Sequence, residues 1–315
     1  MSSSEVTIVI PILNEADSLP ELLKAISSQT RPPREAIFVD SGSTDGSADL
    51  IREFAQCSNV VVAFRVESNL GGLPGGNRNR GIQAAQCEWI AFLDAGIIPE
   101  PTWLERLVNW AETKQTKAVF GVCQFDAAAA FPKAVCAISY GCGAVHPVLP
   151  ASLFHRSVFD STGLFREDLR AAEDRLWLRG FEAAFGPRPV SSAAVVHYCH
   201  FPSSLPKLAR KYWRYECDAV RSGVVGRGEL WLSAAAMLAG LGGLIRFSQA
   251  GMILLFLLVI IRGVVVPIQR SQRSRWLKPP FAAVPMAIGL CFLRDAMKLL
   301  ARCYSLLRLS IPTTR

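Results

Sequence analysis

The sequence predicts an α/β fold with a mostly parallel, doubly wound sheet flanked by helices. Two observations carry this prediction. Short runs rich in Val and Ile alternate with helix-forming stretches through the first third of the chain. Two of these runs also end in an aspartate, Asp40 and Asp94. Because ligands bind at the carboxyl edge of the strands in such sheets, we expect both carboxylates at one binding edge.

The predicted elements follow in order along the chain. They are a strand at 6–10, a helix ending near 26, a strand at 36–39, a helix at about 48–55, a strand at 60–64, a glycine-rich loop at 69–81 that leads into a helix, and strands at 90–94, 118–122 and 152–156. Ser, Asp and Pro stand at the expected helix starts, where these residues are favoured. Further on, Glu173 and Asp174 open another helix, and two histidines, His197 and His200, follow a further strand.

The segment 90–96 contains the most informative of these strands. An apolar run stops abruptly at Asp94, and two small residues, Ala95 and Gly96, follow. A carboxylate in a buried strand is costly unless it lies at the strand end, paired or bound to a cation. An aspartate that only caps the next turn is the alternative.

The glycine-rich segment 69–81 follows the third predicted strand. It has no GxGxxG spacing directly after the first strand, and the chain has no GxxxxGK[ST] loop, so a nicotinamide cofactor is not expected. The glycines could simply permit a tight crossover. Alternatively, backbone amides with Arg78 or Arg80 could approach the phosphates of a ligand. Both interpretations stay open on the sequence alone.

Composition indicates an anionic partner. The chain of 315 residues has a formal net charge of +8, with 34 Lys and Arg against 26 Asp and Glu. The charge favours a phosphate-bearing substrate or an acidic membrane surface. Nucleic acid is not expected, because the basic residues gather near apolar C-terminal segments. Nine cysteines without a CxxC pair indicate free thiols in a reducing compartment, and the polar start suggests no secretory signal.

The C-terminal region 226–315 is expected to associate with a membrane through hydrophobic helices. Its apolar stretches are 230–245, 250–268 and 279–293, and a spanning helix needs about 20 apolar residues. A buried helical subdomain is the alternative. The basic loop 269–278 is expected on the cytoplasmic side. The basic, aromatic helix predicted at 207–221 is expected at an anionic interface, unless it is an ordinary solvated face.

Five landmarks in residues 1–225 occur in a fixed order. They are Ile10-Pro11 to Asn14-Glu15, Val39-Asp40 to Asp45-Gly46, the loop Gly71 to Gly81, Leu93-Asp94-Ala95, and Glu173-Asp174 with Trp177 to Arg179. Together they resemble a family 2 glycosyltransferase with the GT-A nucleotide-sugar-binding fold, over about residues 6–221.

The resemblance implies a role for each matching residue. Pro11, Asn14, Glu15 and Asp40 would contact the nucleoside of a nucleotide-sugar donor, and Arg78 would lie near the donor. Asp94 would hold a divalent cation, Mg²⁺ or Mn²⁺, on the diphosphate, with His197 near the metal. Asp174, next to Glu173, would be the catalytic base.

The implied function is transfer of a sugar from a nucleotide-sugar donor to a lipid-linked or saccharide acceptor, with inversion and with the catalytic domain in the cytoplasm. Membrane lipids would be partners, and cell-envelope polysaccharide would be the product class. Gly96 stands where the family usually has a second acid, and Ser41 replaces a frequent second aspartate. A catalytically degraded, membrane-anchored sugar-nucleotide binder is therefore one alternative. A sugar-nucleotide pyrophosphorylase is another, although it would need a glycine-rich loop after the first strand.

Overall fold

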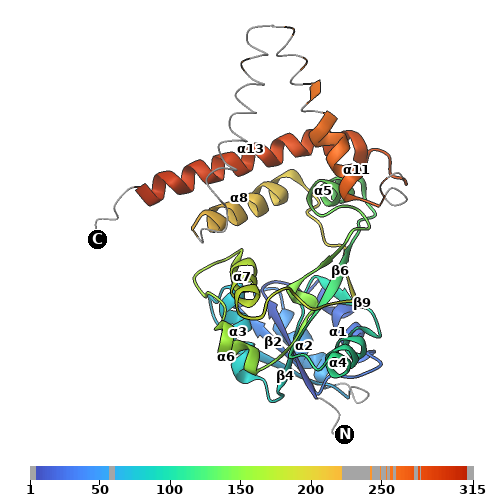
Figure 1. The fold of residues 1–315 in the computed structure, drawn as a ribbon, viewed down its shortest axis with the longest axis vertical. Coiled ribbons are helices and arrows are strands. Elements are labelled where there is room, and N and C mark those ends of the chain that lie inside the picture. Colours follow the sequence, from blue (N-terminus) through green and yellow to red (C-terminus); the bar gives the residue numbers. More distant parts are fainter. Residues whose placement is uncertain are drawn as a thin grey trace. The chain divides into compact units, whose positions relative to one another are not determined.

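The structure of the protein is a computed structural model (Figure 1). It describes residues 5–56, 61–221, 260–272, 276 and 278–310, with isolated positions at 242, 249, 253, 256 and 257. The chain divides into two compact units. The first unit consists of Met1–Gln124 and Val145–Cys199, and the second consists of Phe125–Ala144 and His200–Arg315. The predicted division at residue 225 stays a prediction.

The first unit contains the sheet and the helices that cover it. Its strands are β1 (Val6–Ile12), β2 (Glu35–Asp40), β3 (Ala63–Ser68), β4 (Trp89–Phe92), β5 (Ile97–Pro99), β6 (Ala118–Phe125, whose last residue belongs to the second unit), β7 (Val145–Pro147), β8 (Leu153–His155) and β9 (Val190–Tyr198). Its helices are α1 (Leu19–Ser27), α2 (Ser47–Ala55), α3 (Pro74–Ala84), α4 (Trp103–Lys114), the short turn η1 (Leu149–Ala151), α6 (Ser157–Thr162) and α7 (Glu173–Phe185).

The sheet is mixed, so the prediction of a mostly parallel sheet is only partly right. Its strand order is β3-β2-β1-β4-β8-β6-β9-β5, with β7 beside β6. The four strands up to β4 pair in parallel, whereas β8 runs antiparallel to both β4 and β6. Three of the later strands, β5, β7 and β8, have only three residues each. Strands this short carry too little periodicity for the sequence to reveal their pairing.

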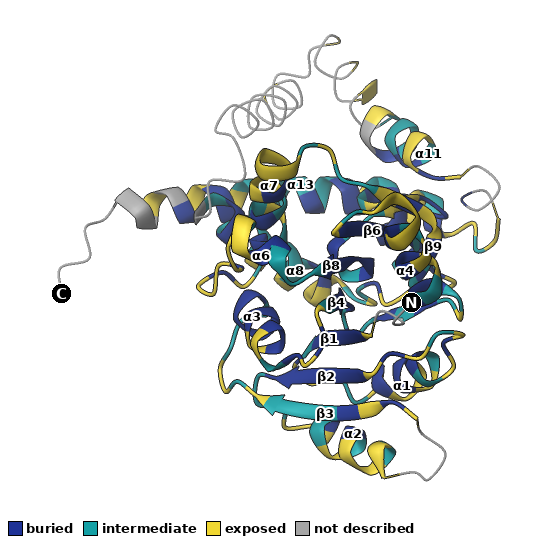
Figure 2. Cartoon of the chain, turned by 60° about the horizontal axis from the view of Figure 1, so that its bottom comes forward, coloured by how far each residue is buried: buried dark blue, intermediate teal, exposed yellow. Residues whose placement is uncertain are grey.

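Central strands β1 and β2 are buried on both faces, as their apolar runs predict (Figure 2). On one face, α3, α6 and α7 contribute to an apolar cluster with the sheet. This cluster includes Val9, Ile37, Phe92, Phe154 and Trp177. The parallel register places Ile12 opposite Asp40 and Asp40 opposite Ser68, so these strands end at a common edge.

Helix α3 begins at Pro74, earlier than the sequence suggests, and therefore includes much of the glycine-rich segment. A Cβ atom at Gly75 would lie 2.1 Å from the carbonyl oxygen of Arg166, and one at Gly81 would lie 2.2 Å from Cγ1 of Val9. Neither position has room for a side chain. The glycines thus let α3 approach β1 and the segment before α7 closely.

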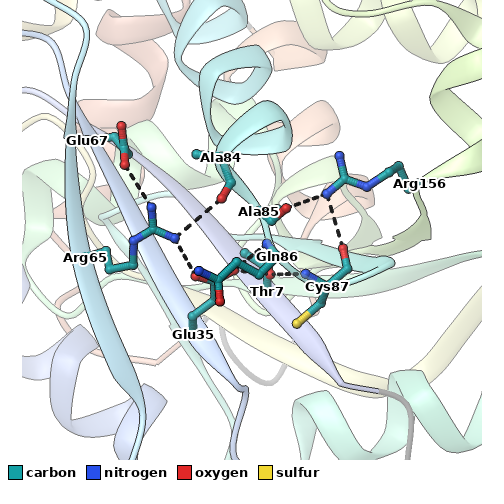
Figure 3. Close-up of polar contacts among 9 residues, drawn as sticks. All are labelled: Thr7, Glu35, Arg65, Glu67, Ala84, Ala85, Gln86, Cys87 and Arg156. Carbon is teal, nitrogen blue, oxygen red and sulfur yellow. Dashed lines mark hydrogen bonds and ion pairs between the residues drawn. The ribbon is translucent and has the colours of Figure 1, made fainter.

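At the opposite edge of the sheet, Glu35 begins β2 and is the centre of a buried polar network (Figure 3). Its Oε1 accepts hydrogen bonds from the Thr7 hydroxyl and the Gln86 backbone N–H, both at 2.7 Å. Its Oε2 accepts from Arg65 at 2.8 Å. Burial alone would raise the pKa of Glu35, but these three donors outweigh it and hold the pKa below the ordinary value.

The second unit is helical in its described residues. It contains α5 (Ala130–Ser139), α8 (Leu205–Arg221), the π-type turn η2 (Ile261–Val265), α11 (Val266–Arg270) and α13 (Ala283–Ser310). Helix α13 packs along α8 and α5. Glu216 of α8 accepts from Arg302 of α13 at 2.6 Å and pairs with Lys298 at 3.1 Å. One face of the predicted basic helix is therefore covered by α13.

The membrane prediction falls partly outside the described residues. Of the apolar stretches, 230–245 lies outside them except for residue 242, and 250–268 and the basic loop 269–278 are described only in part. The stretch 279–293 leads into and begins α13. Among the helices that are described, none combines the length and the apolar character needed to cross a bilayer.

Glu35→Gln is expected to destabilise the protein by about 1–3 kcal/mol at pH 7, because the amide cannot accept at both positions as the carboxylate does. A carboxyl group whose pKa is lowered by folding stabilises the fold above its unfolded pKa of about 4.3 and loses this contribution as the pH falls. The difference between the wild type and the variant should therefore shrink below about pH 4. Urea unfolding over this pH range measures it, with Glu21→Gln on the exposed face of α1 as the control. An equal difference at every pH would contradict the assignment.

Candidate active site

Arg78 of α3 joins the two most informative acidic motifs. Its guanidinium is buried, and Nη2 donates to Oδ1 of Asp94 at 2.9 Å while Nη1 donates to Oε1 of Glu173 at 2.6 Å. The guanidinium also lies over the ring of Phe165, 5.7 Å from its centroid. Burial alone would lower the pKa of Arg78, but the charges of Asp94, Glu173 and Asp174 outweigh it and raise the pKa. Arg78 is therefore a permanent cation held between carboxylates.

Arg80, the other candidate in the glycine-rich segment, lies elsewhere. Its side chain is half exposed and pairs with Glu67 at 3.2 Å. Two residues along a helix are about 200° apart, so Arg78 and Arg80 must face different directions. Of these two arginines, Arg78 is the one that contacts Asp94 and Glu173, and the prediction that either approaches the phosphates of a ligand stays a prediction.

The two acids at the start of α7 have different surroundings. Glu173 is buried with a side-chain exposure of 7%, and burial raises its pKa although Arg78 opposes the shift. Asp174 is half-buried, and its Oδ1 accepts from the Arg175 backbone N–H at 2.7 Å. Ala172, just before them, has a left-handed φ of 69°. The chain therefore turns sharply before it presents both acids at the first turn of the helix.

Sequence reasoning missed the two asparagines that flank Arg78. Asn79 donates to the carbonyl of Phe165 at 2.9 Å and to Glu167 at 2.8 Å, and its Oδ1 accepts from the Phe165 N–H. Asn77 donates to Oγ of Ser41 at 2.7 Å and so attaches α3 to the end of β2. The run of four polar residues at 77–80, inside a glycine-rich segment, was the available signal, but the partners of the two asparagines are distant in sequence.

The predicted nucleoside-contacting residues lie at the edge where β1 and β2 end. Pro11 is half-buried in β1, opposite Val39. Asn14 accepts at Oδ1 from the Thr44 backbone N–H at 2.8 Å, and the Glu15 N–H donates to Oγ of Ser47 at 2.9 Å. These bonds join the loop after β1 to the loop after β2.

Asp40 closes the loop that follows its own strand. Its Oδ1 accepts from the Gly42 and Ser43 backbone N–H groups at 3.2 and 3.0 Å and from the Ser43 hydroxyl at 2.7 Å. This is the turn-capping contact that aspartates commonly make. One oxygen of Asp40 thus caps the turn after β2. This is the alternative role that the sequence suggests for an aspartate at a strand end.

The predicted metal ligands are not gathered into a cluster. His197 of β9 has its Nε2 3.1 Å from Oε1 of Glu100, and no group of three or more His, Cys, Asp or Glu side chains suited to a metal occurs among the described residues. Asp94 follows β4 and its side chain is 42% exposed, so an oxygen donor of this chain is accessible. One carboxylate fits a hard cation such as Mg²⁺ or Mn²⁺ only if a bound diphosphate and water complete the oxygen shell.

Comparison with known proteins supports the predicted family over part of the chain. The model of the family "Glycosyl transferase family 2" matches residues 7–133, which extend from the second residue of β1 to beyond β6 and include Arg78 and Asp94. Residues 7–133 are therefore similar to family 2 glycosyltransferases, as the sequence motifs predict. This match leaves the pyrophosphorylase alternative without support.

Curated relatives resemble only part of this chain. Glycosyltransferase AglE of Haloferax volcanii is 32% identical over 122 residues, which are 38% of this chain and 40% of AglE. The poly(ribitol-phosphate) beta-glucosyltransferase of Bacillus spizizenii is 34% identical over 119 residues, 37% of this chain and 19% of that enzyme. The aligned region thus spans less than half of either relative.

Two solved structures share the fold over nearly the whole chain. One is the mannosyltransferase PcManGT from Pyrobaculum calidifontis in complex with GDP-Man and Mn²⁺, with a TM-score of 0.61 and 18% identity, covering 94% of this chain and 87% of that one. The other is S. aureus TarS 1-349 in complex with UDP-GlcNAc, with a TM-score of 0.51 and 12% identity, covering 96% and 90%. At these identities the likeness shows the fold alone, which is a GT-A-like α/β fold.

Arg78→Met is expected to destabilise the protein by about 3–5 kcal/mol, because it leaves Glu173 buried without its cation. Arg80→Met, two residues along the same helix, removes an exposed pair and should cost about 0–1 kcal/mol. Chemical unfolding of both variants measures the difference. Equal destabilisation would show that Arg78 is not the structural centre of this site.

Proposed function

We propose that this protein transfers a sugar from a nucleotide-sugar donor to an acceptor hydroxyl by a single displacement with inversion at the anomeric carbon. The observation that carries the proposal is the buried bridge from Asp94 through Arg78 to Glu173. It fixes the strand-end carboxylate and the start of α7 to one rigid group. Asp174, the next residue of α7, is half-buried rather than enclosed.

In this mechanism Asp174 takes the proton of the acceptor hydroxyl as that oxygen attacks the anomeric carbon. A general base must be able to reach its proton, and the partial exposure of Asp174 satisfies this requirement. Glu173 is a positioning residue, because its carboxylate is committed to Arg78. No covalent intermediate is required, since acceptor and leaving group lie on opposite sides of the anomeric carbon.

Asp94 is the side chain that would hold a divalent cation on the donor diphosphate. Its Oδ1 accepts from Arg78, and its side chain is exposed enough that the carboxylate would remain accessible to such a cation. When bound, such a cation would neutralise the charge that accumulates on the leaving diphosphate. His197 is a less suitable ligand, because its Nε2 faces Glu100. Pro11, Asn14, Glu15 and Asp40 remain our candidates for the nucleoside end of the donor, at the edge formed by the loops after β1 and β2.

The acceptor, the compartment and the membrane attachment belong to the proposal as well. Cysteines in the described residues are free, which supports a catalytic domain in the reducing cytoplasm. The apolar stretches after residue 226 support an acceptor that is lipid-linked or close to a membrane, with a cell-envelope saccharide as the product. Gly96 favours one second candidate, a sugar-nucleotide binder that has lost turnover.

Asp94→Asn and Asp174→Asn are each expected to reduce sugar transfer or donor hydrolysis by at least about 100-fold, since both remove a charge used in the transition state. Asp160→Asn, on the exposed part of α6, should keep full activity. A panel of UDP-, GDP- and dTDP-sugars, incubated with membrane preparations and a saccharide or lipid fraction, provides the assay. Activity unchanged in both variants would reject the assignment. Donor binding without turnover in every acceptor fraction would support the degraded binder.

Chelation of divalent cations is expected to abolish turnover, and Mn²⁺ or Mg²⁺ should restore it. Gly96→Asp adds a second carboxylate two residues after Asp94 and should lower the Mn²⁺ concentration for half-maximal activity by about tenfold. Gly96→Asn has nearly the same size without the charge and is the matched control. Identical Mn²⁺ titrations for the two variants would show that position 96 does not face the cation.

A further inference from the structure

A cavity of about 240 Å³ lies wholly within the second unit. Its walls come from α5, α8, α11 and α13 and from the segment that contains Phe201. Four of its lining side chains are basic, namely Lys211, Arg270, Arg294 and Lys298, and none of its lining residues is acidic. A concave site with charge of one sign concentrates ligands of the opposite sign.

Two acids beside the cavity compensate part of this positive charge. Glu216 pairs with Lys298 at 3.1 Å and with Arg302 at 2.6 Å, so a single carboxylate serves two cations. Asp295 pairs with Nε of Arg294 at 3.1 Å, which leaves the outer nitrogens of that guanidinium for other partners. One of them donates to the carbonyl of Ile138. Neither acid is part of the cavity wall.

Burial affects the protonation of two lining side chains. Burial, with the charge of Arg214 beside it, lowers the pKa of Lys211. An anion in the cavity would offset both effects, because a nearby opposite charge favours the ammonium form. Burial raises the pKa of Tyr212, whose hydroxyl lies 2.9 Å from Oγ of Ser139. This phenol therefore stays protonated and available for hydrogen bonding at neutral pH.

Much of the remaining wall is aromatic. Tyr140 stacks on Phe125 with ring centroids 4.2 Å apart and planes 3° from parallel, and Phe201 lies 6.3 Å from Tyr140. Guanidinium, ammonium and phenol groups together provide many donors, and this set matches the oxygens of a phosphate better than those of a single carboxylate. The volume is below that of a typical drug-sized site, and a small head group suits it.

We propose that this cavity binds a phosphate or diphosphate group. The ligand could be a soluble phosphate ester or the head group of a phospholipid, because both present the same oxygens. The lining residues lie at 135–140, 201–215, 270, 294 and 298, all in the second unit, and none belongs to the Asp94–Arg78–Glu173 group. It therefore does not rest on the proposed glycosyltransferase activity.

Calorimetric titration of the full chain with pyrophosphate tests the proposal. Lys211→Gln should weaken binding by about tenfold or more, since it removes a charge-assisted contact from a partly buried site. Lys207→Gln is the matched control, because Lys207 is exposed on the same helix and does not line the cavity. Equal losses in both variants, or unchanged binding in Lys211→Gln, would overturn the proposal.

Vesicle flotation separates the two sources of phosphate. Binding to phosphatidic acid vesicles but not to phosphatidylcholine vesicles, lost in Lys211→Gln only, would assign the site to a lipid head group. Pyrophosphate binding without vesicle binding would assign it to a soluble ester. Absence of both would overturn the proposal.

Chemical acetylation of lysines in the wild-type protein, measured by mass spectrometry, tests the site without any substitution. Pyrophosphate or phosphatidic acid vesicles should slow modification of Lys211 relative to Lys207. Equal rates with and without either probe would count against the site.

Discussion

The first unit depends on one buried cation. Arg78 comes from α3, Asp94 from the end of β4 and Glu173 from the start of α7, so its two hydrogen bonds join three elements that are distant in sequence. A buried charge is tolerated only when it is paired. Here the Arg78 cation compensates the buried Glu173 carboxylate, and the two acids compensate Arg78. Asn77 and Asn79 hold the same helix from either side. The candidate active site thus also holds these three elements together.

The pairing of Arg78 with Glu173 explains why the two adjacent acids, Glu173 and Asp174, have different roles in the proposed site. Glu173 faces inward and is occupied by Arg78, whereas Asp174 lies one residue further along the helix and faces different surroundings. Neighbouring positions on a helix are about 100° apart, so one member of a pair can be structural while the other stays accessible. Position 96 is a glycine, so Asp94 is the one carboxylate of this motif that could bind a cation on the donor.

Much of this arrangement could be predicted from the sequence. Asp40 and Asp94 were recognisable because apolar runs end at them, and the pair Glu173 and Asp174 because it opens an amphipathic helix. Arg78 could not be separated from Arg80, since the choice depends on where α3 begins. The antiparallel pairing of β8 was not predictable, because a three-residue strand has no period. The partners of Asn79 were not predictable either, because Phe165 lies 86 residues away.

The chain passes from the first unit to the second and back, and this order determines where its sequence can change in length. The chain leaves the first unit after Gln124 and returns at Val145, and these two residues are paired neighbours on β6 and β7. An insertion between adjacent strand ends disturbs the rest of a sheet little, which is why hairpin tips accept additional sequence readily. Residues 125–144 are therefore a segment whose length and chemistry can change with little effect on the sheet. Such modular exchange would let one transferase scaffold acquire new accessory helices while its sheet stays the same.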